Sequence, residues 1–324
     1  MHSLRRVQLG SSGMFSVALL AGLLGAGCGS SQPDSTIVGG ELGQGQAGFQ
    51  LFTPGGDAGN GSGNGGSSPG IGYSTTLPAG FTAADTFGGY RLGDPIATGD
   101  GAGGSAGSST TTDGCGTTIL AVIRDFQADH MNFEGNTGDD RGLVKPDLGP
   151  DRKPILASSN PTRTVEDPAQ FDSWYRNVDG LNLPFKFEIW FGPSQGKSSF
   201  QSTSFFPLDG AGFGNQGNNH NFHFTTEIHT QFKYGGKENF NFTGDDDVWV
   251  FINNKLVIDL GGVHVAEDAS VDIDSRAAEL GLVIGNVYPF DMFQNERHTS
   301  QSNFRADTTL NFVSCGVIVP EIPK

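Results

Sequence analysis

Three consecutive aspartates, Asp245, Asp246 and Asp247, have the clearest capacity for chemistry in this sequence. Two carboxylates about 4 Å apart repel one another by roughly 1 kcal/mol in water, and by more where solvent is thin. Two interpretations follow. The aspartates bind a cation, for which Ca²⁺ is the natural candidate because it takes about six to eight oxygen ligands. Alternatively, they form a solvated turn in which their side chains accept hydrogen bonds from backbone N–H groups.

The segments around the aspartates predict β-strands that would position them. Residues 248–252 (VWVFI) are apolar at every position, which is typical of a strand buried on both faces. Asn253 and Asn254 predict a tight turn because both tolerate positive φ. Residues 222–234 alternate between apolar and polar, which predicts a strand with an apolar inner face and a polar outer face. Many such segments and few helical ones predict an all-β, antiparallel β-sandwich.

The segment GDDDVWVFINNKLVIDLGGVH, residues 244–264, closely resembles the central motif of the fibro-slime domain, which is related to the protective-antigen-type (PA-14-like) sandwich modules. Further family motifs follow in order along the chain, at residues 124–126 (RDF), 172–176 (DSWYR), 205–210 (FFPLDG), 221–225 (NFHFT) and 296–299 (ERHT). The resemblance covers about residues 117–313. It implies a PA-14-like β-sandwich of extracellular and cell-surface proteins.

The resemblance also implies a calcium site. In sugar-binding relatives, two consecutive aspartates share a cis peptide and hold Ca²⁺, which then binds glycan hydroxyls. Aligning the motifs assigns this pair to Asp245 and Asp246. Asp247 replaces the usual glycine, and we expect it to supply an additional ligand oxygen. Four further residues are expected to complete the site or to support its ligands: Asn303, Asn295, Asn253 and His264.

The first 28 residues predict an export signal. Arg5 and Arg6 precede a mostly apolar run of 13 residues, 14–26, which is shorter than the roughly 20 residues that span a bilayer as a helix. Cys28 follows small residues, as in a bacterial lipoprotein signal, so we expect it to be lipidated. An ordinary secretory signal is the alternative. No aspartate follows Cys28, which favours the outer membrane as the location.

The composition divides the remaining chain. Residues 29–114 contain 25 of the 50 glycines and predict a disordered tether. Within it, the scattered apolar residues of 72–98 leave open whether a small ordered segment forms there. The folded domain is expected at 115–324. Cys115 and Cys315 lie at its two ends, and in an exported protein they predict one disulfide; two unpaired thiols are the alternative.

The net charge and the motifs argue against several classes of function. The balance of 19 − 35 = −16 argues against nucleic-acid partners and against electrostatic docking to anionic lipid, but it is compatible with divalent cations. No motif places a nucleophile beside a base, so we expect no enzyme. We expect a cell-surface lipoprotein with a Ca²⁺-dependent module for extracellular polysaccharide or matrix, attached to the membrane only by its lipid anchor. The alternative is a structural surface protein whose aspartates only stabilise the fold.

Overall fold

The computed structural model describes residues 76–96 and 117–319. The predicted signal and tether, with Cys28 and Cys115, lie outside the described residues, so lipidation and the pairing of Cys115 with Cys315 stay predictions. Within the described part of the chain, no helix is long and apolar enough to cross a membrane.

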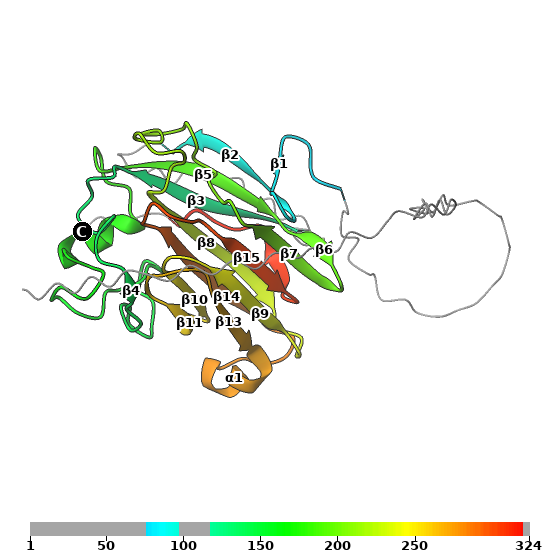
Figure 1. The fold of residues 1–324 in the computed structure, drawn as a ribbon. Coiled ribbons are helices and arrows are strands. Elements are labelled where there is room, and N and C mark those ends of the chain that lie inside the picture. Colours follow the sequence, from blue (N-terminus) through cyan, green and yellow to red (C-terminus); the bar gives the residue numbers. More distant parts are fainter. Residues whose placement is uncertain (1–75, 97–116, 320–324) are drawn as a thin grey trace, which may run out of the picture. The chain divides into compact units, whose positions relative to one another are not determined.

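Two antiparallel sheets form the body of the protein (Figure 1). The larger has nine strands, in the order β1 (Thr82–Ala83), β2 (Gly89–Pro95), β5 (Asn182–Trp190), β3 (Thr118–Phe126), β8 (Phe224–Lys233), β14 (Val287–Glu296), β10 (Val248–Ile252) and β11 (Lys255–Leu260), with β16 (Asn311–Ser314) also paired to β8. The smaller has five strands, in the order β13 (Glu267–Asp272), β9 (Asn239–Gly244), β15 (Phe304–Thr308), β7 (Lys197–Ser202) and β6 (Gly192–Ser194).

The main core lies between these two sheets. It combines inward-facing side chains of the larger sheet, such as Phe224 and Val250, with those of the smaller sheet, such as Phe200, Phe242 and Phe304. Aromatic rings pack edge to face within it, as Phe200 and Phe304 do at 5.4 Å between ring centroids. The prediction of an all-β, antiparallel sandwich is therefore confirmed.

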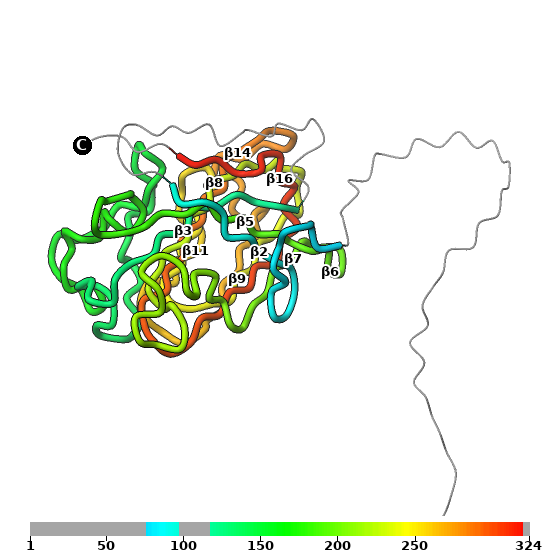
Figure 2. Tube along the Cα trace, turned by 90° about the horizontal axis from the view of Figure 1, so that it is seen from above, coloured from blue at the N-terminus to red at the C-terminus, as the bar shows by residue number. Residues whose placement is uncertain are grey.

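The outer face of the nine-stranded sheet is also buried. Residues 127–181 cover it, and Figure 2 shows this segment, in green, gathered at one side of the strands. A second apolar cluster forms there around Trp174, Trp249 and Phe293. The polar outer face expected for β8 is buried as well: Glu227 and His229 are each 1% exposed. The alternation was predicted correctly, but the covering segment has no strand pattern of its own that would reveal it.

The remaining elements are short. β4 (Gly138–Asp139) pairs with β12 (Gly262–Val263), and the described residues also form a 3₁₀ helix at Pro168–Trp174 and α1 at Ile273–Leu280. The segment 72–98, whose order the sequence left open, contributes β1 and β2, and β2 pairs with β5 from Gly89↔Trp190 onward. These two strands thus lie at one edge of the larger sheet, and the sandwich begins before residue 115.

Candidate functional site

The aspartate run connects the two sheets. β9 lies second from one edge of the smaller sheet, β10 lies second from one edge of the larger sheet, and Asp245, Asp246 and Asp247 join them. The peptide bond between Asp245 and Asp246 is cis, at the pair to which the motif alignment assigned it. All three side chains are buried, with exposures of 2%, 4% and 0%.

Asn303 and His264 lie against the first two aspartates, as expected from the sequence. The Asn303 backbone N–H donates to one oxygen of Asp245 at 2.6 Å, and its side-chain amide donates to the other at 2.7 Å. Asp246 accepts from the backbone N–H groups of His264 at 3.2 Å and Arg297 at 2.8 Å. Backbone from three separate loops therefore holds the pair.

Asp247 has a different partner from the expected metal ion. Both of its oxygens accept from the Arg297 guanidinium, at 2.6 Å from Nε and 3.0 Å from Nη2. Arg297 is fully buried, donates to the carbonyl oxygens of Asn132 and Thr164, and stacks over Trp174 at 4.7 Å. Because a guanidinium fork matches a carboxylate in charge and geometry, Asp247 already has its counter-ion in this structure.

Asn295 and Asn253 also differ from expectation. Asn295 is buried behind the aspartates, where its amide donates to Asp247 at 3.0 Å and its oxygen accepts from the Tyr175 hydroxyl at 2.5 Å. Both ends of this side chain are therefore used within the protein. Five strand residues separate Asn253 from the aspartates, so it lies at the opposite end of β10. There its side chain donates to the Leu280 carbonyl oxygen.

Glu296 was not recognised as a site residue from the sequence. Its side chain lies in the interior at 1% exposure, and neither carboxylate oxygen has a hydrogen-bond partner. The Ser302 hydroxyl donates instead to the Phe205 carbonyl oxygen at 2.7 Å. Burial raises the pKa of Glu296 well above its ordinary value, and the charges of Asp246 and Asp245 raise it further; the nearby Ser302 hydroxyl and His298 backbone N–H lower it without reversing the shift.

The aspartates experience the same excess of negative charge. Burial raises the pKa of Asp246 well above its ordinary value; the charge of Arg297 opposes this shift, and that of Asp247 adds to it. Burial also raises the pKa of Asp245, against the hydrogen bonds from Asn303. Four carboxylates thus share one buried guanidinium, which already pairs with Asp247.

Few acidic side chains at this site could bind a metal ion. Among the described residues, no three His, Cys, Asp or Glu side chains come together as a group that could hold a metal ion by themselves. Asp245 and Asp246 are therefore the carboxylates available to a cation, and its other oxygen ligands would come from amide or carbonyl groups, water or a bound hydroxyl. Every oxygen of the three aspartates accepts an N–H in this structure.

Comparison with known proteins identifies relatives of this chain. Two proteins of Dictyostelium discoideum resemble the chain: "Protein psiR" is 42% identical over 215 residues, covering 60% of this chain and 21% of that protein. "Protein psiD" is 41% identical over 222 residues, covering 61% and 43%. The chain thus spans less than half the length of these relatives.

Among solved structures, the PA14 domain of the MpAFP antifreeze protein matches 60% of this chain and 82% of its own, with 10% identity and a TM-score of 0.26. A β-glucosidase from Kluyveromyces marxianus in complex with glucose matches 27% of this chain and 10% of its own, with 15% identity and a TM-score of 0.20. These scores are low, so the architecture rests on the strands themselves. The family model for the PA14 domain matches residues 209–324, a stretch that includes the three aspartates and Asn303.

Proposed function

We propose that this chain is an exported surface lipoprotein of the fibro-slime type whose sandwich binds extracellular polysaccharide or matrix through Ca²⁺. Asp245 and Asp246 would hold the ion, with the Asn303 amide beside them. When bound, Ca²⁺ supplies positive charge and coordination sites for a pair of sugar hydroxyls. The match of residues 209–324 to the PA14 domain and the family motifs support this proposal.

The observation that carries the proposal is the unpartnered carboxylate of Glu296 beside the aspartates. A buried ionised carboxylate without hydrogen bonds is strongly unfavourable, so it is ordinarily paired, protonated or near a metal ion. Here Arg297 pairs with Asp247, and the structure shows no further cation bonded to Asp245, Asp246 or Glu296 among the residues it describes. In the absence of a cation, a proton on Glu296 relieves this excess of negative charge, in keeping with its raised pKa; a divalent cation at the aspartate pair would offset the excess when that proton is lost.

The chain's own residues prepare the site. Arg297 fixes Asp247 and also donates its backbone N–H to Asp246, so one residue sets two aspartates in place. Asn303, just before β15, positions both oxygens of Asp245. We propose binding rather than catalysis, because the side-chain oxygens of Asp245 and Asp246 are held by backbone and amide donors.

A second function is favoured by a specific observation. Each of the aspartate oxygens accepts a hydrogen bond from the protein, and the exposures of the pair, 2% and 4%, are low. A structural surface protein would use such an arrangement to join its two sheets. In that case, the aspartates hold the turn between β9 and β10 without a ligand.

The two functions are distinguished by polysaccharide binding. The full chain would be incubated with immobilised polysaccharides in Ca²⁺ and in EDTA, beside the Asp245→Asn/Asp246→Asn variant. Asp268→Asn is the matched control, because Asp268 is an exposed aspartate that bonds only the Thr243 hydroxyl. The proposal expects retention in Ca²⁺ for the native chain and the control alone. Equal retention in EDTA, or by the double variant, would reject the calcium-dependent function.

A further inference from the structure

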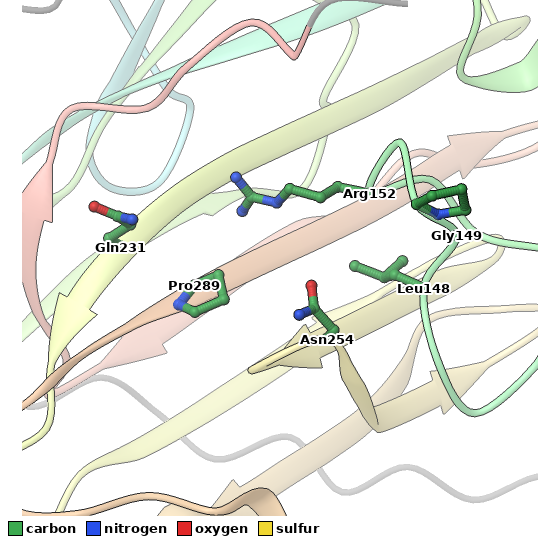
Figure 3. A pocket seen from close by; sticks show the side chains of 7 residues that line it. Leu148, Gly149, Arg152, Gln231, Asn254 and Pro289 are labelled. Atoms are coloured by element: carbon green, nitrogen blue, oxygen red, sulfur yellow. The ribbon is translucent and has the colours of Figure 1, made fainter. Parts of the chain in front are cut away.

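A depression of about 440 Å³ lies on the outer face of the nine-stranded sheet, away from the aspartates (Figure 3). It forms where β8, β14 and the β10–β11 turn meet a loop of the covering segment. We propose that it binds an anionic sugar unit of an acidic polysaccharide, independently of calcium. Its main lining residues are Leu148, Pro150, Arg152, Gln231, Asn254 and Pro289.

The walls of this depression are fixed by the backbone. Pro289 of β14 lies directly opposite Gln231 of β8 in the strand register. The Asn253 N–H donates to the Pro289 carbonyl oxygen at 3.0 Å, and the Leu148 N–H donates to that of Asn254, also at 3.0 Å. The turn and the loop are thereby both tied to the sheet, so the depression is formed before any ligand arrives.

Arg152 provides the positive charge of the depression. Its Nη2 lies 2.5 Å from Asp291, while Nε is buried and has no hydrogen-bond partner. Figure 3 shows the guanidinium extended toward Gln231, with Pro289 and Asn254 below it. The Arg152 side chain is 27% exposed, so its planar guanidinium can present positive charge to a carboxylate or another oxyanion in the depression, although the buried Nε itself is out of reach.

Several charged side chains lie behind Arg152. Lys153 and Arg124 both pair with the buried Glu227, and His229 lies between Glu227 and Asp291, with 2.5 Å from a ring nitrogen to each carboxylate. Asp151, which precedes Arg152, pairs with Arg176, and Arg176 also pairs with Asp172, so the charges behind the depression balance. Arg152 is the one charged residue among those that line the depression, which favours an anion over a neutral ligand.

The rest of the lining is suited to a sugar ring. The exposed amides of Gln231 and Asn254 offer donors and acceptors for hydroxyl groups. Leu148, Pro150 and Pro289 present apolar surface for the C–H face of a ring. The end of β14 that lies against the aspartates is about six residues from Pro289, or roughly 20 Å along the strand. This site is therefore distinct from the calcium site proposed above.

Calorimetric titration of the full chain with a tetrasaccharide of galacturonic acid would test this inference. The same tetrasaccharide as its methyl ester is the uncharged control, and both titrations are made in EDTA at low salt. Arg152→Gln removes the guanidinium. Gln231→Glu introduces a negative charge at an exposed position, so it is not expected to affect folding. Arg305→Gln is the matched control, because Arg305 is 49% exposed on the smaller sheet.

We expect the acid to bind, and the methyl ester to bind at least tenfold more weakly. Arg152→Gln and Gln231→Glu should each weaken binding of the acid at least tenfold, while Arg305→Gln should leave it unchanged. The inference is overturned if the native chain does not bind the acid at millimolar concentration, if acid and ester bind alike, or if Gln231→Glu binds the acid as tightly as the native chain does.

Discussion

Replacing Arg297 with methionine should strongly destabilise the protein. The substitution removes five hydrogen bonds of the guanidinium, two of them to Asp247, and leaves that carboxylate buried with only the Asn295 amide and the Gly262 N–H as donors. Removing one partner of a buried ion pair typically costs about 3–5 kcal/mol. This loss is a substantial fraction of the roughly 5–15 kcal/mol of stability that a domain of this kind has in total.

Urea unfolding at 25 °C, followed by tryptophan fluorescence, would measure this loss. Trp174 lies directly under the guanidinium, so its environment reports on the site. Arg305→Met is the matched control: Arg305 is half exposed and pairs only with Asp307, so its loss should cost less than about 1 kcal/mol. Asp247→Leu combined with Arg297→Met removes both charges, and it should cost less than the sum of the single variants.

The reasoning would be refuted if Arg297→Met unfolds within about 1 kcal/mol of Arg305→Met. It would also be refuted if the losses of Arg297→Met and Asp247→Leu were simply additive, since two residues that form one buried pair must be coupled. Either result would show that the guanidinium does not hold the aspartate turn in place.

Three further predictions concern individual side chains. Asn303→Ala removes the amide that contacts Asp245 and should weaken Ca²⁺ binding about tenfold, or roughly 1.4 kcal/mol, in calorimetry; unchanged affinity would contradict the site. Glu296→Gln should stabilise the calcium-free protein by about 1–3 kcal/mol at pH 7.5, because it removes a buried carboxylate without partners. Since the folded pKa of Glu296 is raised, its unfavourable effect grows as pH rises above the unfolded value, and the gain should be smaller at pH 5; equal gains would contradict this. Burial raises the pKa of Asp125 from 3.8 to about 6, so this residue's favourable contribution is lost as pH rises through that interval; carbon NMR titration should find a midpoint near 6, and one near 3.8 would refute the burial argument.

Much of the fold could be predicted from local pattern. The apolar run 248–252 forms β10, the alternation after Phe222 forms β8, and Asn253 and Asn254 both have positive φ in the turn between β10 and β11. These features depend on residues adjacent in sequence. The covering of the outer sheet face depends instead on long-range contacts of an irregular segment, which no periodicity signals.

The site could be predicted only in part for the same reason. The motif placed Asp245 and Asp246 correctly at a cis peptide between two strands, and it identified Asn303 as a neighbour. The pairing of Asp247 with Arg297 joins residues that are 50 positions apart. Glu296 precedes Arg297 in the ERHT motif, which was the available signal, but sequence alone does not show that its carboxylate is buried without a partner.

The most direct test of the central claim is calorimetric titration of Ca²⁺ into the full chain at pH 7.5, with Asp246→Asn measured in parallel. We predict saturable binding to the native chain, a rise of its melting temperature with Ca²⁺, and loss of both in the variant. Absence of binding heat together with a melting temperature unaffected by chelator, or equal binding by Asp246→Asn, would contradict the claim that these aspartates hold a calcium ion.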